Sequence, residues 1–270
     1  MRIVIPTHGR VNRQPTLMAL PPDLRREVLL VASNEVEAAQ VRANFRLAAK
    51  QVKVAPVKTI TDKRQWILEN VKDDVFMLDD DMVFYKRPSP ACRDFVGGRW
   101  KARPGYKTLS LDYVKDSGVV NLFRLLEEEL ENYPLVGISS RFGNDLEPLD
   151  WKSGANRIMH GFGYHRKTTK ALKFKFNDVG FREDFHLALT MFRAGHQSLQ
   201  CYEWCVAPGA YGAPGGCSAE RTVEASNVAA EDLARLHPGF VKVVDKDYKG
   251  TPRKEVVVSW KKALESSSRK

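Results

Sequence analysis

The first 78 residues alternate short apolar runs with stretches of helical pattern, and this alternation constrains the fold more than any other feature. The apolar runs are residues 2–6, 27–32, 51–57 and 75–78, and the helical stretches are residues 35–49 and 61–70. An order of strand, helix and strand predicts a parallel sheet with helices on its faces. Ligands of such sheets bind beyond the carboxyl ends of the strands, so a site is expected in the loops that follow the apolar runs.

The second half of the chain continues this pattern after a looser stretch. It predicts helices at residues 117–132 and 183–194 and strands at residues 135–139, 158–165 and 200–206. The predicted fold class is α/β, with a Rossmann-like, mostly parallel central sheet and helices on both faces. With 270 residues, we expect one large domain at 1–238, followed by a basic C-terminal segment at 239–270 that packs on it.

Positive charge is concentrated in two segments of the chain. The net charge is +10, with seven Lys or Arg against one acid in residues 86–107 and nine against four in residues 239–270. We interpret residues 86–107 as a basic loop, and the balance favours a polyanionic partner. Four cysteines are too few for a disulfide scaffold, and we find neither a membrane-spanning apolar stretch nor a signal-peptide pattern. We therefore expect a cytoplasmic protein with no membrane association.

Three adjacent carboxylates, Asp79, Asp80 and Asp81, directly follow the apolar run 75–78. A bound cation would relieve their mutual repulsion at the end of a buried strand, and hard oxygen ligands suit Mg²⁺ or Mn²⁺. Because side chains alternate along a strand, Asp79 and Asp81 are the expected metal ligands. A solvated acidic turn or a helix cap explains the triplet equally well, although the apolar segments on both sides favour an embedded site.

A second acidic pair, Glu183 and Asp184, opens the predicted helix at 183–194. Carboxylates in the first turn of a helix are stabilised by the helix dipole, which is a sufficient structural explanation. The functional alternative is that one of the two lies in a cleft as a general base and deprotonates a hydroxyl group.

A glycine-rich stretch at residues 207–222 contains the basic residue Arg221 near its end. Its glycines would let backbone N–H groups approach phosphates closely, and a flexible linker is the alternative. The six histidines show no spacing typical of a metal site, and we keep only His165 as a candidate site residue.

Taken together, these motifs resemble the glycosyltransferases of the GT-A fold, which use nucleotide sugars and carry an Asp-x-Asp metal motif at the end of a strand. The matching motifs are residues 5–10, 62–64, 79–81, and 183–184 before a helix that ends at 194–196. More narrowly, the chain resembles the bacteriophage glycosyltransferases associated with TET/JBP-type DNA base hydroxylases. That likeness includes residues 141–144, 161–165 and 215–222, and it spans about residues 1–262.

The resemblance implies transfer of a sugar from a nucleotide diphosphate donor, a UDP-sugar, to the hydroxymethyl group of 5-hydroxymethylpyrimidine, chiefly 5-hydroxymethylcytosine, in phage DNA. Residues 1–85 would be the nucleotide-binding half and residues 108–238 the acceptor half. Mn²⁺ or Mg²⁺ on Asp79 and Asp81 would stabilise the charge on the leaving diphosphate. The implied donor-binding residues are Pro6, Thr7, Arg10, Arg64, Asp79, Asp80, Gly161 and His165.

On the acceptor side, Asp184, with Glu183 as its rival, would deprotonate the hydroxymethyl oxygen if the enzyme inverts the anomeric centre. A retaining enzyme would need no such base. The basic segments would bind DNA phosphates and Trp100 would stack on a base, with ordinary loop packing as the alternative. We expect a monomer, in the host cytoplasm if the chain is phage-encoded. The expected acceptor contacts are Arg141, Asn144, Gly215, Gly216, Arg221, Trp100, Arg99 and Lys101.

Other functions fit parts of the same sequence. In a GT-A glycosyltransferase with a protein or glycan acceptor, the basic segments would be incidental, and turnover would not depend on modified DNA. A DNA-binding module without catalysis is disfavoured by residues 79–81, which repel phosphate unless a metal ion is present. A nucleotidyltransferase is expected to open with a glycine-rich pyrophosphate loop, of which residues 6–10 are a poor version.

Overall fold

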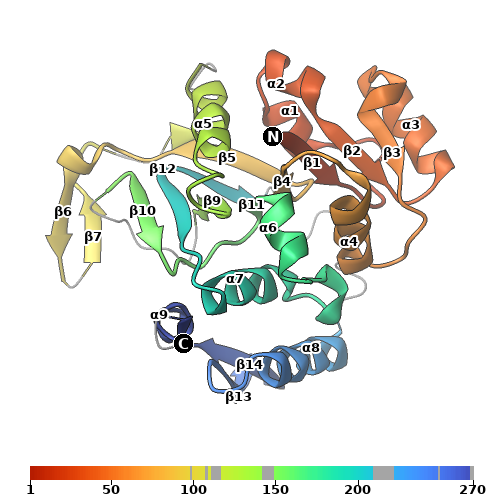
Figure 1. Cartoon of the computed structure of the whole chain (residues 1–270). Helices are drawn as coiled ribbons and strands as arrows, with labels where there is room; N and C mark the ends of the chain where they lie inside the picture. Colours follow the sequence, from red (N-terminus) through yellow and green to blue (C-terminus); the bar gives the residue numbers. More distant parts are fainter. Residues whose placement is uncertain are drawn as a thin grey trace.

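The computed structural model describes residues 1–97, 99–106, 109–110, 117–141, 149–208, 222–248 and 250–267. Within these residues, a ten-stranded sheet has the order β3-β2-β1-β4-β11-β9-β12-β5-β8, and β10 pairs with β12 (Figure 1). The strands are β1 (Arg2–Pro6), β2 (Leu29–Ala32), β3 (Val52–Val54), β4 (Val75–Leu78), β5 (Met82–Lys86), β8 (Leu109–Ser110), β9 (Leu135–Ser140), β10 (Trp151–Gly154), β11 (Gly161–Tyr164) and β12 (Ser198–Pro208).

The first four neighbours in the sheet, β3, β2, β1 and β4, are parallel, as the alternating sequence pattern predicted. Antiparallel pairing begins where β11 lies between β4 and β9. Strands β9, β12 and β8 run in the same direction as the first four, whereas β11, β5 and β10 run in the opposite direction. The mostly parallel sheet is therefore confirmed. Because β1, β2 and β4 are parallel, their carboxyl ends lie on the same side of the sheet.

Helices cover both faces of the sheet because successive residues of each buried strand point to opposite sides. Ile3 and Ile5 belong to one apolar cluster and Val4 to the other. The first cluster includes residues of α1 (Pro15–Ala19), α3 (Glu35–Phe45) and α5 (Ser117–Glu128), and Leu24 of α2 (Pro22–Glu27) packs against it. The second includes residues of α4 (Ile60–Asn70) and α7 (Glu183–Arg193), and α6 (Arg166–Ala171) lies on the same side (Figure 1).

The segment 86–107, expected as a basic loop, contains a β-hairpin, so the loop prediction was wrong there. Strand β6 (Arg93–Val96) pairs with β7 (Arg99–Ala102). Phe95 and Trp100 lie opposite each other in this pair, with their ring centroids 5.6 Å apart. Gly97 has a φ of +60°, a conformation that glycine adopts at little cost, and it allows the chain to reverse. A short 3₁₀ turn, η2 (Pro90–Cys92), precedes the hairpin.

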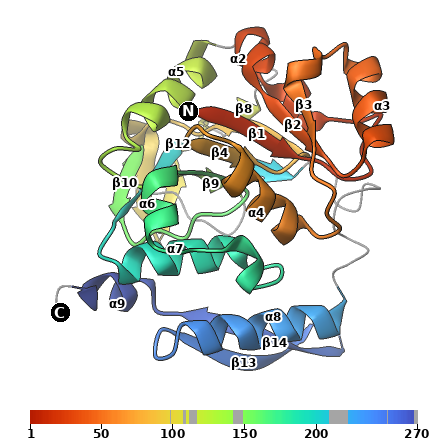
Figure 2. The ribbon, with the colours of Figure 1, turned by 45° about the vertical axis from the view of Figure 1, so that its right-hand side comes forward.

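The last part of the chain forms a layer beyond α7 (Figure 2). Helix α8 (Val223–Leu236) packs on the hairpin of β13 (Val241–Tyr248) and β14 (Thr251–Val258), which leads to α9 (Trp260–Glu265). Trp260 of α9 contacts Phe185 and Phe192 of α7, with ring centroids 5.1 Å and 6.2 Å apart. The predicted basic segment thus includes this hairpin and α9. Among the described residues, we find no helix that combines the length and apolarity needed to cross a membrane.

Candidate active site

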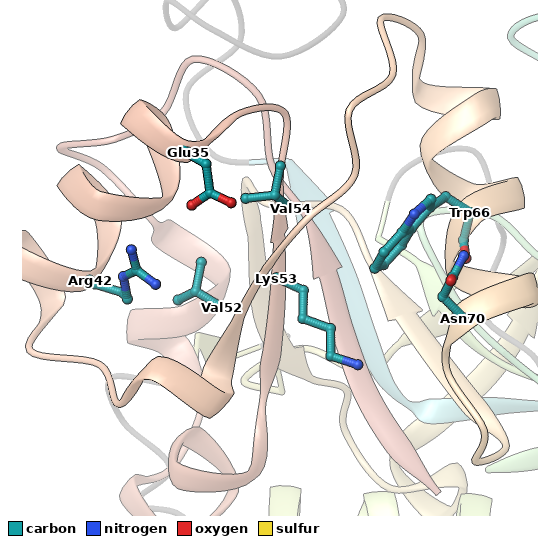
Figure 3. A pocket seen from close by; sticks show the side chains of 7 residues that line it. All are labelled: Glu35, Arg42, Val52, Lys53, Val54, Trp66 and Asn70. Atoms are coloured by element: carbon teal, nitrogen blue, oxygen red, sulfur yellow. The ribbon is translucent and has the colours of Figure 1, made fainter.

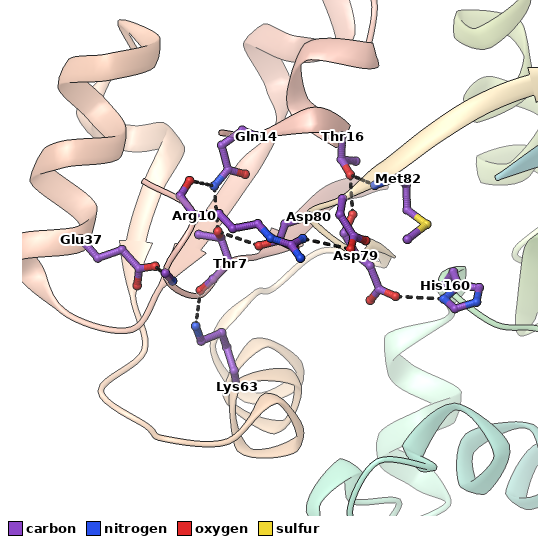
Figure 4. A network of polar contacts seen from close by, with 12 residues as sticks. Thr7, Arg10, Gln14, Thr16, Glu37, Lys63, Asp79, Asp80, Met82 and His160 are labelled. Carbon is purple, nitrogen blue, oxygen red and sulfur yellow. Dashed lines mark hydrogen bonds and ion pairs between the residues drawn. The ribbon is translucent and has the colours of Figure 1, made fainter. Parts of the chain in front are cut away.

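The acidic triplet lies at the carboxyl end of β4, beside the loop that follows β1 (Figure 4). Thr7 Oγ1 donates to Asp80 Oδ2 at 2.9 Å, and the Arg10 guanidinium forms ion pairs with Asp80 and Asp81, the latter at 3.1 Å. Asp80 is buried, and this burial raises its pKa to about 6 although Arg10 acts in the opposite direction. The structure therefore brings together Thr7, Arg10 and the triplet.

Two polar residues that the sequence analysis missed support this arrangement. Gln14 Nε2 donates to Thr7 Oγ1 at 2.7 Å and to the Arg10 carbonyl oxygen at 2.9 Å. Thr16 Oγ1 donates to the Asp79 carbonyl oxygen at 2.5 Å and accepts from the Met82 backbone N–H at 2.7 Å. Both side chains are buried in and just before the short helix α1. In the sequence, the only local sign of such a role was that Gln14 and Thr16 are polar residues beside apolar ones.

Lys63 and Glu37, also missed, connect the loops after β1 and β2. Lys63 Nζ donates to the Thr7 carbonyl oxygen and, at 2.8 Å, to Ser33 Oγ. The Glu37 carboxylate accepts from the backbone N–H groups of Gly9 and Ser33, both at 2.6 Å. Both side chains are buried, so the two loops are held at fixed positions by charged groups. The motif at residues 62–64 was the available signal for Lys63.

Arg64 connects the two acidic motifs. Its Nη2 lies 2.6 Å from Asp79 Oδ1, and its Nη1 donates to Glu183 Oε1. Arg64 and Glu183 are both buried, and Glu183 Oε2 has no hydrogen-bond partner among the described residues. The sequence placed Arg64 on the donor side and treated Glu183 as a possible base. The structure instead commits one oxygen of Glu183 to Arg64, which leaves Asp184 as the less constrained carboxylate.

Asp184 lies in the first turn of α7, next to Glu183. Its burial, together with the negative charge of Glu183, raises its pKa to about 6, and the positive charge of Arg64 opposes this shift. Asp184 Oδ1 accepts from the backbone N–H of Phe185 at 2.9 Å. A carboxyl group with a pKa near neutrality can act as a general base at physiological pH.

His160, a further missed residue, contacts Asp79 and is close enough to Asp184 to feel its charge. Its Nδ1 is 3.2 Å from Asp79 Oδ2, and its backbone carbonyl accepts from the Asp79 N–H at 3.1 Å. Burial acts to lower the pKa of His160, but the hydrogen bond to Asp79 and the charges of Asp79 and Asp184 outweigh it, so the pKa is raised. No local sequence pattern marked this residue, because it meets Asp79 only through the pairing of β11 with β4.

The remaining predicted donor residues lie in different places. Pro6 ends β1, next to Thr7. Gly161 pairs with Leu78, and a Cβ atom there would lie 3.1 Å from Leu78 Cδ2, so close packing accounts for the glycine. His165 lies at the other end of β11, where its Nδ1 is 2.7 Å from Thr168 Oγ1. His165 therefore lies at the opposite end of the paired strands β11 and β4 from Asp79.

Many cations of the basic segment 86–107 have internal partners. Lys86 pairs with Glu203 at 2.9 Å, and Arg103 pairs with Asp94 at 2.9 Å. Arg87 and Arg93 are buried and donate to backbone carbonyls, among them those of Tyr202 and Pro88. These four side chains therefore contribute less to a DNA-binding surface than the charge count of the sequence suggested.

Among the predicted acceptor residues, Lys101 is exposed and Trp100 is half-buried against Phe95. The Arg141 guanidinium carbon lies 4.0 Å from the centroid of the Tyr85 ring. Arg99 is a backbone member of β7. Four other predicted contacts lie outside the described residues: Asn144, Gly215, Gly216 and Arg221.

A cleft of about 360 Å³ lies away from this cluster, along the edge strand β3 between α3 and α4 (Figure 3). Its lining includes Arg42, Lys53 and Trp66. None of the residues predicted for donor, metal or acceptor binding lines it. The carboxylate cluster therefore remains the candidate site on chemical grounds.

Comparison with known proteins gives one family. A family model for TET-associated glycosyltransferases matches residues 1–215, which include the whole carboxylate cluster. Among solved structures, the chain is similar to the crystal structure of S. aureus TarS 1-349, with 12% sequence identity and a TM-score of 0.48. That alignment covers 87% of this chain and 66% of that chain, just under two thirds of its length. No curated protein sequence matches.

Proposed function

Because the chain belongs to the TET-associated glycosyltransferase family, we propose that it transfers a sugar from a UDP-sugar to the hydroxymethyl group of 5-hydroxymethylcytosine in phage DNA. The observation that carries this proposal is the convergence of the two acidic motifs on Arg64, at the carboxyl end of β4. The donor-binding and acceptor-binding sites would then adjoin each other, with Arg64 bonded to an acid of each. The GT-A-like arrangement of the sheet and its helices agrees with this assignment.

The donor is assigned to the loops after β1 and β4. Ligands of parallel sheets bind beyond the carboxyl ends of the strands. Thr7, Arg10 and the acidic triplet lie at those ends. Five carboxylates gather there with three basic side chains. The carboxylates are Asp79, Asp80, Asp81, Glu183 and Asp184, and the cations are Arg10, Lys63 and Arg64. The excess of negative charge favours a site that also takes a divalent cation.

The residues present fit such an ion. Asp79 and Asp81 keep 29% and 30% of their side chains exposed, whereas Asp80 is buried and bonded to Thr7 and Arg10. Mg²⁺ and Mn²⁺ usually bind one or two carboxylates and complete their shell with water and substrate phosphates. Within the described part of the chain, no group of three or more His, Cys, Asp or Glu side chains is arranged to hold a metal ion by itself, so water and substrate phosphates would have to complete the shell. When bound, the ion would offset the charge of the leaving diphosphate.

We assign the base to Asp184. In the proposed inverting reaction, the hydroxymethyl oxygen bonds to the anomeric carbon while the bond from that carbon to the diphosphate oxygen breaks. The hydroxyl proton passes to the Asp184 carboxylate. A pKa of about 6 leaves this carboxylate ionised at neutral pH, yet basic enough to accept the proton in the transition state. Glu183 is less suited because its Oε1 is already bonded to Arg64.

The DNA acceptor rests on the family and on the exposed groups of the hairpin β6–β7. Phe95 of β6 and Tyr106, which follows β7, expose 63% and 54% of their surfaces, and Lys101 of β7 is also exposed. Exposed aromatic rings are suited to stacking on bases, and exposed cations are suited to pairing with phosphates. Because other cations of segment 86–107 have internal partners, we expect DNA affinity to depend on few residues of this hairpin.

The decisive experiment incubates the protein with Mn²⁺, a panel of nucleotide sugars, and DNA that contains either 5-hydroxymethylcytosine or unmodified cytosine. Nucleoside mass analysis should show a hexose- or pentose-sized gain on the hydroxymethyl base alone. Slow hydrolysis of the donor without any gain would retain the glycosyltransferase and reject the DNA acceptor, in favour of a protein or glycan. Absence of both reactions with every donor would contradict the proposed function.

A further inference from the structure

We propose that His160 is a positioning residue, which orients the Asp79 carboxylate for the divalent ion. The inference rests on the proposed function, because it assigns a role at the same metal site. Its basis is a strained turn whose backbone and side chain both contact Asp79. Sequence motifs gave no reason to select this histidine.

The backbone at His160 forms a γ-turn of the rare positive-φ kind. Its φ is +66°, and the N–H of Gly161 donates to the carbonyl oxygen of Met159 at 2.7 Å. This kind of turn is strained for any residue that carries a side chain. The turn directs the His160 carbonyl oxygen to the backbone N–H of Asp79, at 3.1 Å, immediately before β11 begins.

The side chain of His160 makes a second contact with the same residue. An ionised carboxylate only accepts hydrogen bonds, so His160 Nδ1 must carry the proton that it donates to Asp79 Oδ2, at 3.2 Å. The other oxygen, Oδ1, accepts from Arg64 at 2.6 Å. Both oxygens of Asp79 are thus oriented by donors from two different elements of the fold.

The position of the strain favours a functional origin. Four non-glycine residues have positive φ among the described residues: Arg46, His160, Lys173 and Phe181. Arg46 is the C-cap of α3, where the left-handed conformation is common. His160 instead precedes a strand, where no helix end requires this geometry. Residues held in sparsely populated backbone regions concentrate at functional sites.

Metal affinity is the property that such a contact should change. Groups that hydrogen-bond to metal ligands fix the orientation of those ligands, and their removal typically lowers metal affinity 10- to 100-fold. Asp79 is only partly buried, so its carboxylate would rotate more freely without the imidazole. We therefore expect the loss of His160 to weaken Mn²⁺ binding without unfolding the chain.

Two substitutions separate the backbone from the side chain. His160→Gly keeps the positive φ without strain, and so preserves the backbone bond to Asp79 while removing the imidazole. His160→Asn keeps a short side chain with an N–H donor, and asparagine tolerates positive φ better than most residues. His196→Gly is the matched control, because His196 lies after the C-terminal end of α7, away from the site.

The experiment measures free Mn²⁺ by electron paramagnetic resonance during titration of the full chain in the presence of UDP, with thermal unfolding recorded in parallel. For His160→Gly we expect a dissociation constant about 10-fold higher than that of the wild type. His160→Asn should stay within a few-fold of the wild type, and His196→Gly should be unchanged.

Equal Mn²⁺ affinity of the wild type and His160→Gly would overturn the role of His160 and leave the metal site intact. Equal weakening in the Gly and Asn variants would overturn the hydrogen bond as its cause. If the wild type itself binds no Mn²⁺ in the presence of UDP, both this inference and the metal dependence of the proposed function fail. Sugar transfer, assayed separately, would still decide the rest of that function.

Discussion

Arg64 Nη2 lies 2.6 Å from Asp79 Oδ1, although Arg64 is in the middle of α4 and Asp79 is in the loop that follows β4. The same guanidinium bonds to Glu183, so it is the shared partner of the donor-side and acceptor-side acids. A planar guanidinium can donate to two carboxylates at once from fixed directions, whereas the three donors of a lysine ammonium rotate freely. This relationship connects the proposed metal site to the helix that carries the proposed base.

Replacement of Arg64 tests this connection. Arg64→Met leaves the buried carboxylate of Glu183 without a cation, so we expect a loss of about 3 kcal/mol in the free energy of unfolding. Urea denaturation monitored by tryptophan fluorescence measures this loss. The double variant Arg64→Met with Glu183→Gln removes the unpaired charge and should recover part of it. Equal stability of Arg64→Met and the wild type would show that the pair contributes nothing.

Asp81 is the carboxylate to remove in a test of metal dependence. Its side chain is 30% exposed, so Asp81→Ala should leave the unfolding midpoint unchanged, while Mn²⁺-dependent turnover falls about 100-fold or more. Asp23→Ala, on the exposed surface of α2, is the control for loss of a carboxylate. Turnover that persists in Asp81→Ala and resists chelation would remove the metal role.

The raised pKa of Asp184 predicts the acid limb of the pH–rate profile. A base must be deprotonated to act, so kcat/KM should fall as the pH drops through about 6. Asp184→Asn should lower kcat about 1,000-fold while UDP binding is retained. Parallel measurement of Glu183→Gln distinguishes the two acids. Wild-type rates in Asp184→Asn would exclude Asp184 as the base.

The salt dependence of DNA binding tests whether exposed lysines of the hairpin β6–β7 and of α9 bind phosphate. Lys101→Gln, combined with Lys261→Gln in α9, should raise the apparent KM for DNA. For every lysine that pairs with a phosphate, its replacement should flatten the slope of log affinity against log salt by about 0.9. Lys101 and Lys261 are both exposed, so stability should not change. An unaltered slope would mean that neither residue binds phosphate.

A buried histidine pair makes stability depend on pH. His186 Nδ1 and His237 Nε2 lie 2.8 Å apart, and Arg193 donates to the other nitrogen of His237 at 3.1 Å. Burial is the main cause that lowers the pKa of His186 to about 4 and that of His237 to about 3, from an ordinary value near 6.5. The folded chain therefore resists protonation that the unfolded chain accepts.

This stability is fully present above about pH 6.5 and is lost as the pH falls toward 4, because protons then bind the unfolded state preferentially. For His186 alone the loss approaches about 3 kcal/mol. Urea midpoints at several pH values measure it. A double variant, His186→Gln with His237→Gln, should show a flatter profile, and an equally steep one would assign the acid sensitivity to other groups.

Much of the fold follows from local patterns. Strands β1, β2 and β4 and helices α3 and α4 lie within or close to the predicted runs, because apolar periodicity is readable within a few residues. The strand predicted at residues 51–57 is shorter, since β3 ends at Val54 and Pro56 has no N–H to donate to a ladder. The hairpin β6–β7 was missed because its charged residues masked the alternation between its faces.

Some residues of the candidate site could also be recognised from the sequence, whereas others could not. Asp79, Asp80, Asp81 and Asp184 were recognisable from the sequence, because clustered carboxylates beside apolar segments are a local signal. His160 and Glu37 were not, since each acts on residues from another part of the chain. The sequence by itself thus determined the α/β class and the acidic motifs. Only the tertiary structure decided which carboxylate meets which cation, because strand order and packing bring Arg64 to Glu183 across 119 residues of chain.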